Sequence, residues 1–145
     1  MEYTEGVRFD SLGLSPEIMR AIAQREIQVS TPVQAGCIPP MMDWQDVIAK
    51  APTGTGKTFA YGIPIVEHID PEDESVQAVI LAPTRELAIQ ITDEIRDLSR
   101  YKPGVRCVCL YGGQPIGRQI DTLKKRPQIV VATPGRLSDH MKRRT

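Results

Sequence analysis

The chain has 145 residues, of which 41% are hydrophobic and 25% are charged, and its formal net charge is zero. This composition is typical of one soluble globular domain that can bury a real core. The overall charge predicts no nucleic-acid partner, so local groups would have to hold one. No apolar run approaches the length of a membrane span, and the N-terminus has no signal-peptide pattern.

The three cysteines are Cys37, Cys107 and Cys109. Cys107 and Cys109 are two residues apart in a strand-like run, so their side chains should share one face. The number is odd and no ligands stand at zinc-site spacing, so we expect buried, reduced thiols. A reducing compartment fits such thiols best, and the predicted localisation is cytoplasmic.

Two helices are expected before the first strand. Ser15-Pro16 opens one of them, with the serine as N-cap and the proline in the first turn. Thr31-Pro32 opens the other, and Gln34 falls three residues after Thr31, which is the spacing of a capping box. This second helix should end before Pro39-Pro40, because a proline disfavours the helical conformation of the residue before it. Phe9, ahead of both helices, would by itself be a packing anchor.

From Asp46 onward the pattern alternates between strand and helix. Short runs rich in Val and Ile predict strands at 47–51, 78–82, 105–111 and 129–132, and helical patterns follow them from about 57, 84, 115 and 133. This alternation predicts an α/β fold of three layers, with a mostly parallel sheet and helices on both faces. Ligands of such sheets bind at the carboxyl ends of the strands, so the loops there should share one edge.

Residues 51–58 read A-P-T-G-T-G-K-T, a phosphate-binding loop between a predicted strand and a predicted helix. Gly54 and Gly56 let the backbone turn its amides inward, and the helix should begin near Gly56 or Lys57, so that its positive end faces the anion. Lys57 is placed to reach the outer phosphates, and the Thr58 hydroxyl is placed to ligate magnesium. The predicted phosphate-loop contacts are Thr53, Gly54, Thr55, Gly56, Lys57 and Thr58. The alternative, an ordinary Gly-rich turn with a stray lysine, does not account for this spacing.

The loops after the other three predicted strands share a form. Each places a cap residue or a glycine at the start of a helix, which leaves free backbone amides there, and two of them add an arginine. They are Pro83-Thr84-Arg85, Gly112-Gly113-Gln114 and Thr133-Pro134-Gly135-Arg136. Helix N-termini with arginines suit the successive phosphates of a nucleic-acid strand. The alternative is plain capping, with Arg85 and Arg136 in solvated ion pairs.

Together these motifs resemble the N-terminal part of the DEAD-box RNA helicases. Phe9, Gln34, the 51–58 loop, P-T-R-E-L-A (83–88), Gly112-Gly113, Gln119 and T-P-G-R (133–136) stand in the family's order and spacing. The resemblance implies a RecA-like core over 46–145 that uses ATP and Mg²⁺. It implies an adenine-recognition segment over 9–34, in which Phe9 stacks on adenine and Gln34 reads its edge. It also assigns the three strand-end loops to the backbone of single-stranded RNA.

Two residues depart from the family pattern. Glu26 stands where a glycine is common, and it adds a negative charge near the expected base site. Ser30 stands where a proline is common. The basic runs 124–126 and 142–144 match no ligand motif, and we interpret them as a solvated face.

The predicted strands run into Pro83, Gly112 and Thr133, whereas phosphate-loop hydrolases need an acidic residue at a strand end. In the family, the D-E-A-D segment lies one strand after T-P-G-R, and this chain stops at Thr145 first. We therefore expect a domain that is incomplete at its C-terminal end. It should bind ATP or ADP weakly without useful hydrolysis, and its open sheet edges invite self-association.

The leading interpretation is an ATP-dependent RNA helicase that unwinds or remodels RNA duplexes, with Lys57 and Thr58 as catalytic residues of the intact enzyme. One alternative is a non-catalytic half-domain that binds nucleotide or RNA. A second is a small phosphate-loop kinase or GTPase, which would need its own base pocket or lid and would leave the arginine-bearing loops unexplained. Comparing ATP with GTP, and RNA binding across a salt series, separates these alternatives.

Overall fold

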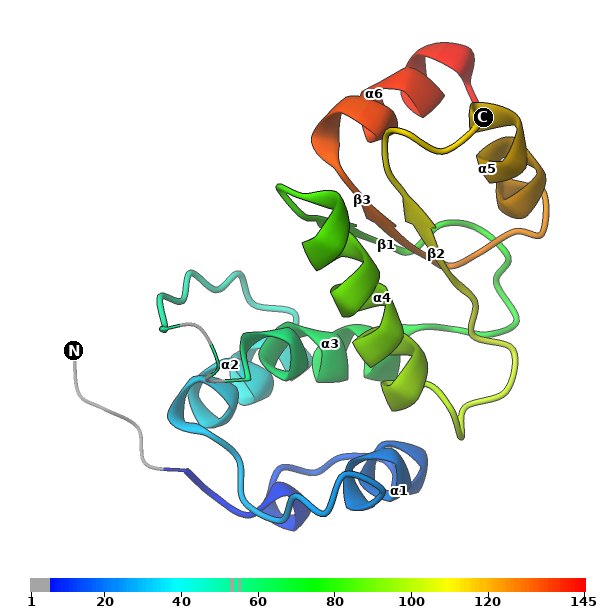
Figure 1. Ribbon diagram of the computed structural model, residues 1–145. Helices are drawn as coiled ribbons and strands as arrows, with labels where there is room; N and C mark the ends of the chain where they lie inside the picture. Colours follow the sequence, from blue (N-terminus) through cyan, green and yellow to red (C-terminus); the bar gives the residue numbers. More distant parts are fainter. Residues whose placement is uncertain (1–5, 53, 55) are drawn as a thin grey trace. The chain divides into compact units, whose positions relative to one another are not determined.

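The computed structural model of the chain describes residues 6–52, 54 and 56–145. It divides into two compact units (Figure 1). The helical unit is drawn from Met1–His68 and Asp97–Pro103, and the sheet unit from Ile69–Arg96 and Gly104–Thr145. Within the described ranges, no helix combines the length and the apolar character that crossing a membrane requires.

The described residues of the helical unit form a 3-10 helix and three α-helices. They are η1 (Phe9–Ser11), α1 (Pro16–Ala23), α2 (Pro32–Met42) and α3 (Lys57–His68). Ser15 caps α1 as predicted, because its Oγ accepts a hydrogen bond from the Ile18 amide over 3.3 Å. Helices α2 and α3 pack against each other. The fully buried apolar side chains of this unit include Phe9, Ile18, Ile22, Ile38, Ile63 and Val66.

The predicted end of α2 is wrong, because the helix continues through Pro39 and Pro40 to Met42. A proline inside a helix removes one backbone hydrogen bond and costs about 3 kcal/mol. The packing of α2 against α3, which buries Ile38 completely, offsets this local cost. The carbonyl oxygen of Pro40 is also satisfied, since it accepts from the Asp43 amide at 3.1 Å and from the Gln45 amide at 2.9 Å.

The predicted strand Val47–Ala51 is also wrong, because the sheet contains three strands and none of them pairs with this segment. The side chain of Ile48 is 99% exposed and that of Val47 is 37% exposed. A strand exists only where a neighbouring strand satisfies its backbone groups. An apolar run predicts burial and extended backbone, but it does not identify the neighbour that would accept the pairing.

The sheet unit contains a parallel sheet in the order β1-β3-β2. Its elements are β1 (Ala78–Leu81), α4 (Arg85–Leu98), β2 (Cys107–Leu110), α5 (Ile116–Leu123), β3 (Ile129–Ala132) and α6 (Pro134–Arg143). The last two residues of α4, Asp97 and Leu98, belong to the helical unit. Three of the four predicted strands are thereby confirmed. All four residues of the central strand β3 are buried, as expected of a strand with neighbours on both sides and helices on both faces.

Helices cover both faces of the sheet (Figure 1). On one face, Leu123 of α5 and Leu137 of α6 pack against a cluster formed by Val108, Leu110, Val130 and Ala132. The opposite face carries Cys107 and Cys109, and helix α4 lies there, since Arg96 donates to the carbonyl oxygen of Cys107 over 3.0 Å. The predicted three-layer α/β fold and the shared face of the two cysteines are both confirmed.

Candidate nucleotide site and nucleic-acid interface

The phosphate loop leads directly into α3, which begins at Lys57 as predicted. Gly54 and Gly56 have φ angles of +82° and +81°, a region that side-chain-bearing residues rarely adopt. Among the described residues, a helical bond runs from the Ala60 amide to the Gly56 carbonyl oxygen over 3.2 Å. The first amides of a helix have no acceptor within the helix, so the start of α3 is suited to an anion. Thr53 and Thr55 lie outside the described residues.

Lys57 is exposed and Thr58 is half-buried at this helix start. Lys57 also lines a cavity of about 280 Å³ whose other lining residues carry no charge. These are Val33, Cys37, Met41, Val47, Ala49, Ala60 and Tyr61. Lys57 is the one charged group among the described residues that line this cavity, so an anion at the loop would meet its ammonium without competition from a carboxylate of that lining.

Gln34 forms the capping box that its spacing predicts. Its side-chain Oε1 accepts from the main-chain amide of Thr31 at 2.9 Å, and the main-chain amide of Gln34 donates to the Thr31 Oγ1 at 3.4 Å. The remaining end of the side chain reaches the phosphate loop, where Nε2 donates to the carbonyl oxygen of Gly56 over 3.1 Å. A Cβ added at Gly56 would collide with this Nε2, so glycine is required there by space as well as by φ.

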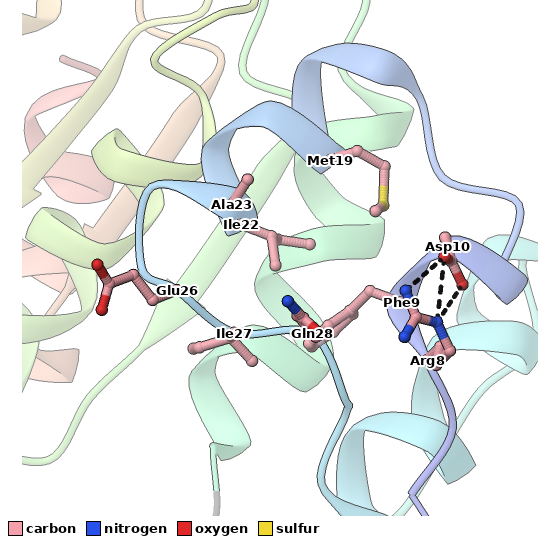
Figure 2. A pocket seen from close by; sticks show the side chains of 9 residues that line it. All are labelled: Arg8, Phe9, Asp10, Met19, Ile22, Ala23, Glu26, Ile27 and Gln28. Carbon is pink, nitrogen blue, oxygen red and sulfur yellow. Dashed lines mark hydrogen bonds and ion pairs between the residues drawn. The ribbon is translucent and has the colours of Figure 1, made fainter.

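Phe9 is 1% exposed and lines a cavity of about 180 Å³ in the helical unit (Figure 2). The other lining residues are Arg8, Asp10, Met19, Ile22, Ala23, Glu26, Ile27 and Gln28. The cavity wall is fixed by a backbone hydrogen bond from Phe9 to Gln28 over 3.1 Å. Gln34 is not among the described residues that line this cavity. The joint contact of Phe9 and Gln34 with adenine stays a prediction.

The structure shows different local requirements at Glu26 and Ser30, the two departures from the family pattern. Glu26 has a φ of +58°, so the position calls for a left-handed conformation that glycine adopts at no steric cost. In Figure 2 its carboxylate points away from Phe9. Ser30 is 4% exposed, and its Oγ accepts from the Val7 amide at 3.0 Å and donates to the Val7 carbonyl oxygen at 2.8 Å. It thereby ties the N-terminal segment to the residues before α2.

The strand-end loops meet at the carboxyl edge of the sheet unit. The guanidinium of Arg85 lies over the ring of Tyr111, with 5.7 Å from its central carbon to the ring centroid. Arg85 also forms a loose ion pair with Glu86 at 4.0 Å, and both side chains are more than half exposed. Thr84 caps α4, accepting from the Leu87 amide over 3.2 Å. Plain capping and a solvated ion pair therefore do describe the loop that carries Arg85.

Arg136 is different, because its side chain is only 15% exposed. Its Nη1 donates to the carbonyl oxygen of Gln114 at 2.9 Å and to Oε1 of Gln119 at 3.1 Å, and its Nε lies 3.6 Å from Asp139. The guanidinium is thus mostly buried, and it makes contacts with Gln114 and Gln119 beyond its ion pair with the exposed Asp139. It joins the loop at the start of α6 to the double-glycine loop, so two of the three predicted RNA loops are mechanically connected.

Sequence reasoning missed His140, which is 3% exposed in α6 and contacts Gln119. Burial, followed by the nearby charge of Arg136, holds the pKa of His140 below its ordinary value of 6.5. Gln119 itself is the buried residue of α5. The only sequence signal for either residue was the family position of Gln119.

A parallel sheet with helices on both faces, preceded in the sequence by a phosphate loop, defines a RecA-like phosphate-loop domain. The family model of the DEAD/DEAH box helicases matches residues 31–145, and the chain belongs to this family. It is 50% identical over 139 residues to the DEAD-box ATP-dependent RNA helicase CshA of Bacillus subtilis, and 48% identical over 138 residues to CshA of Listeria monocytogenes. These alignments cover 96% and 95% of the chain, but only 28% and 26% of the two relatives.

Solved structures are similar over the same residues. A DEAD box protein from the hyperthermophile Methanococcus jannaschii superposes with a TM-score of 0.88 at 39% identity, covering 94% of this chain and 37% of that one. The helicase Mss116, solved with single-stranded RNA and UDP-BeF, has a TM-score of 0.86 at 41% identity, covering 97% and 31%. The predicted fold class and family are thus confirmed.

Proposed function

We propose that this chain binds ATP or ADP at the phosphate loop and binds single-stranded RNA at the strand-end loops, as part of an ATP-dependent RNA helicase. The observation that carries the proposal is the meeting of the loops at one sheet edge, where Arg85 lies over Tyr111 and Arg136 holds Gln114. The names of the relatives, which are ATP-dependent RNA helicases, support it. The RNA bound to Mss116 supports the second ligand.

The residues of the phosphate loop fit a triphosphate. The left-handed glycines and the start of α3 supply main-chain donors, and Lys57 supplies a compact charge for the outer phosphates. Thr58 is the residue we propose as the magnesium ligand, and Lys57 and Thr58 would be the catalytic residues of this loop in an intact helicase. Mg²⁺, when bound with the nucleotide, neutralises charge that develops on the phosphates. Thr53 and Thr55 complete the proposed set of contacts.

We expect binding with little hydrolysis from the chain itself. Strands β1, β2 and β3 lead into Ala82-Pro83, Tyr111-Gly112 and Thr133, so no carboxylate follows any strand of the described sheet. Activation of the attacking water requires such a group. The 145-residue chain should therefore behave as a nucleotide- and RNA-binding half-domain, while the helicase activity belongs to a protein that adds the acidic element.

Calorimetric titration with ATP, ADP and GTP tests the nucleotide site. Lys57→Ala should weaken ATP binding by about tenfold or more, since a charge-assisted contact contributes about 1.5–3 kcal/mol. Lys50→Ala is the matched control, because it removes an exposed lysine just outside the motif. Tighter binding of GTP than of ATP would favour a GTPase. ATP turnover above background that disappears in Lys57→Ala would contradict the half-domain description.

Fluorescence anisotropy with a labelled single-stranded RNA tests the interface. Arg85→Ala should weaken binding similarly for different RNA sequences, and it should lower the salt-dependence slope by about 0.7–1 per lost phosphate contact. Lys124→Ala is the control with the same loss of charge, because Lys124 follows the C-terminal end of α5, whereas the double-glycine loop precedes its N-terminal end. Equal losses in both variants would indicate a diffuse charge effect and contradict an interface at the strand-end loops.

We also propose a reducing, cytoplasmic location. The three cysteines are free, and Cys37 and Cys107 are buried. Burial raises the pKa of the Cys107 thiol to about 12, so this residue carries almost no thiolate at neutral pH. Such thiols need no disulfide partner and suit a compartment that keeps them reduced. Fractionation of cells that express the chain with an epitope tag tests this location.

A further inference from the structure

His140 makes contacts that the proposed function does not use. Its Nε2 lies 2.8 Å from Oε1 of Gln119 in α5, and its Nδ1 lies 2.7 Å from Oγ1 of Thr145. Both ring nitrogens are therefore engaged, and the ring is almost completely buried. A buried, fully hydrogen-bonded histidine fixes the groups that it contacts. The role of His140 therefore depends on the contacts that Gln119 makes in turn.

The hydrogen-bond partners of Gln119 determine how its amide is oriented. Its Nε2 donates to the main-chain carbonyl oxygen of Tyr111 at 2.8 Å and to Oε1 of Gln114 at 2.9 Å. A main-chain carbonyl oxygen only accepts hydrogen bonds, so the nitrogen of Gln119 must face Tyr111. The oxygen Oε1 then faces Arg136 Nη1 and His140 Nε2. All four hydrogen-bonding positions of this side chain are used.

The same geometry determines the tautomer of His140. Because Oε1 of Gln119 only accepts, the hydrogen between the two side chains must lie on His140 Nε2. The neutral ring then has a bare Nδ1 that accepts from the Thr145 hydroxyl. The charged groups that act on the ring are Arg136, Arg143 and Asp139, and the lowered pKa agrees with a neutral ring at physiological pH.

Gln119 clamps the double-glycine loop at both ends. It holds the carbonyl oxygen of Tyr111 before the two glycines and the side chain of Gln114 after them. Arg136 adds a third bond, to the Gln114 carbonyl oxygen. Between the clamped ends, Gly113 has a φ of +86°, and a Cβ added at Gly112 would meet nothing within 4 Å. The loop is thus fixed at its ends while its glycine backbone stays open to a ligand.

We propose that His140 is a positioning residue for this edge of the sheet. Its Nε2–H donates to Oε1 of Gln119. The Gln119 side chain in turn fixes the double-glycine loop and accepts a second hydrogen bond from Arg136. Without that donor, Oε1 loses one of its two partners and the clamp loosens. The consequence for RNA affinity rests on the proposed function, whereas the effect on the loop does not.

Nuclear magnetic resonance of the 145-residue chain tests the proposal directly. The imidazole nitrogen shifts of the wild-type chain should report the Nε2–H tautomer. His140→Leu removes the donor and should raise hydrogen exchange of the Gln119 side-chain amide and the Gly113 amide by about tenfold, as expected for one lost buried hydrogen bond. His140→Gln keeps an N–H donor of similar reach and should restore protection. Met141→Leu, at an exposed neighbour, is the control.

The outcomes separate this proposal from the proposed function. An Nδ1–H tautomer, or unchanged exchange in His140→Leu, would overturn the positioning role. The tautomer measurement uses the wild-type chain, so it tests the positioning role even if His140→Leu does not fold. With the positioning role correct, RNA affinity should fall about three- to tenfold in His140→Leu and recover in His140→Gln. Loop loosening in a chain that binds no RNA would support the positioning role and reject the RNA interface.

Discussion

Gln34 donates a hydrogen bond from Nε2 to the carbonyl oxygen of Gly56 over 3.1 Å, which joins the start of α2 to the phosphate loop. The other end of the same amide accepts from the Thr31 amide and completes the cap of α2. One side chain therefore has two separable contacts, one for helix stability and one for the loop. The capping box is confirmed at this residue, and the nucleotide role that the resemblance implies stays a prediction.

Gln34→Glu and Gln34→Ala should separate these contacts. The glutamate keeps an oxygen for the Thr31 amide but loses the donor to Gly56, and its charge faces a carbonyl oxygen. We expect ATP affinity to fall about tenfold in Gln34→Glu, with a smaller loss of thermal stability than the roughly 1 kcal/mol that a lost cap costs in Gln34→Ala. Titration calorimetry and thermal unfolding measure the two effects. Unchanged ATP affinity in Gln34→Glu would disconnect this bond from nucleotide binding.

Glu26→Gly should stabilise the helical unit. Glu26 has a φ of +58°, and the left-handed conformation costs a side-chain-bearing residue roughly 1 kcal/mol. Glycine avoids this cost, but it also raises the entropy of the unfolded chain, which offsets part of the gain. We expect a gain of about 0.5 kcal/mol in the free energy of unfolding by urea titration. Glu26→Ala removes the carboxylate but keeps the Cβ, so it should bring no such gain. If the charge itself weakens nucleotide binding, both variants will bind ATP more tightly.

Ser30→Pro should destabilise the chain, although the family commonly has proline there. The substitution removes the Ser30 amide that donates to the Val7 carbonyl oxygen at 2.7 Å, together with both hydroxyl bonds to Val7. We expect a loss of about 2 kcal/mol, and a smaller loss in Ser30→Ala, which keeps the backbone bond. Urea unfolding measures both variants. Equal stability of Ser30→Pro and the wild type would show that the bonds between Ser30 and Val7 contribute nothing to stability.

The sequence was sufficient to predict the features that depend on local patterns. The start of α3 at Lys57, the cap at Ser15 and three of the parallel strands each follow from residue type and spacing within one segment. Prediction from the sequence failed for features that depend on contacts with residues distant along the chain. Segment 47–51 has the composition of a strand but no neighbour in the sheet, and α2 crosses two prolines because α3 packs against it.

The candidate interface shows the same limit at the level of side chains. Spacing placed Arg136 in a strand-end loop, but it did not show that the guanidinium is mostly buried and holds Gln114. The burial of Gln119 in α5 depends on partners from the 111–114 loop and from α6, none of which a helical period encodes. Polar networks of this kind are set by tertiary contacts and leave little trace in local sequence.

Leu81→Lys should reduce self-association of the chain. Leu81 and Val79 are 57% and 51% exposed on edge strand β1, on the sheet face that α5 and α6 otherwise cover. Exposed apolar edges promote pairing between molecules, and an added lysine opposes it. Sedimentation velocity over a concentration series should show association that weakens in Leu81→Lys but persists in Val76→Lys, whose exposed valine precedes the strand. A wild-type monomer at every concentration would reject this prediction.

Stability should depend on pH through His140. The pKa of His140 is held below its ordinary value of 6.5, so on acidification the unfolded chain takes up this proton first. Between the ordinary pKa and the lowered folded-state pKa, the unfolded state binds more protons, and the free energy of unfolding decreases as the pH falls. This contribution is fully present above about pH 6.5. Urea unfolding at stepwise lower pH should therefore show a decline in the wild-type chain that His140→Gln reduces, because glutamine does not titrate. His68→Gln controls for the other histidine of the chain. A decline that is the same in His140→Gln as in the wild type would show that His140 is not the group responsible.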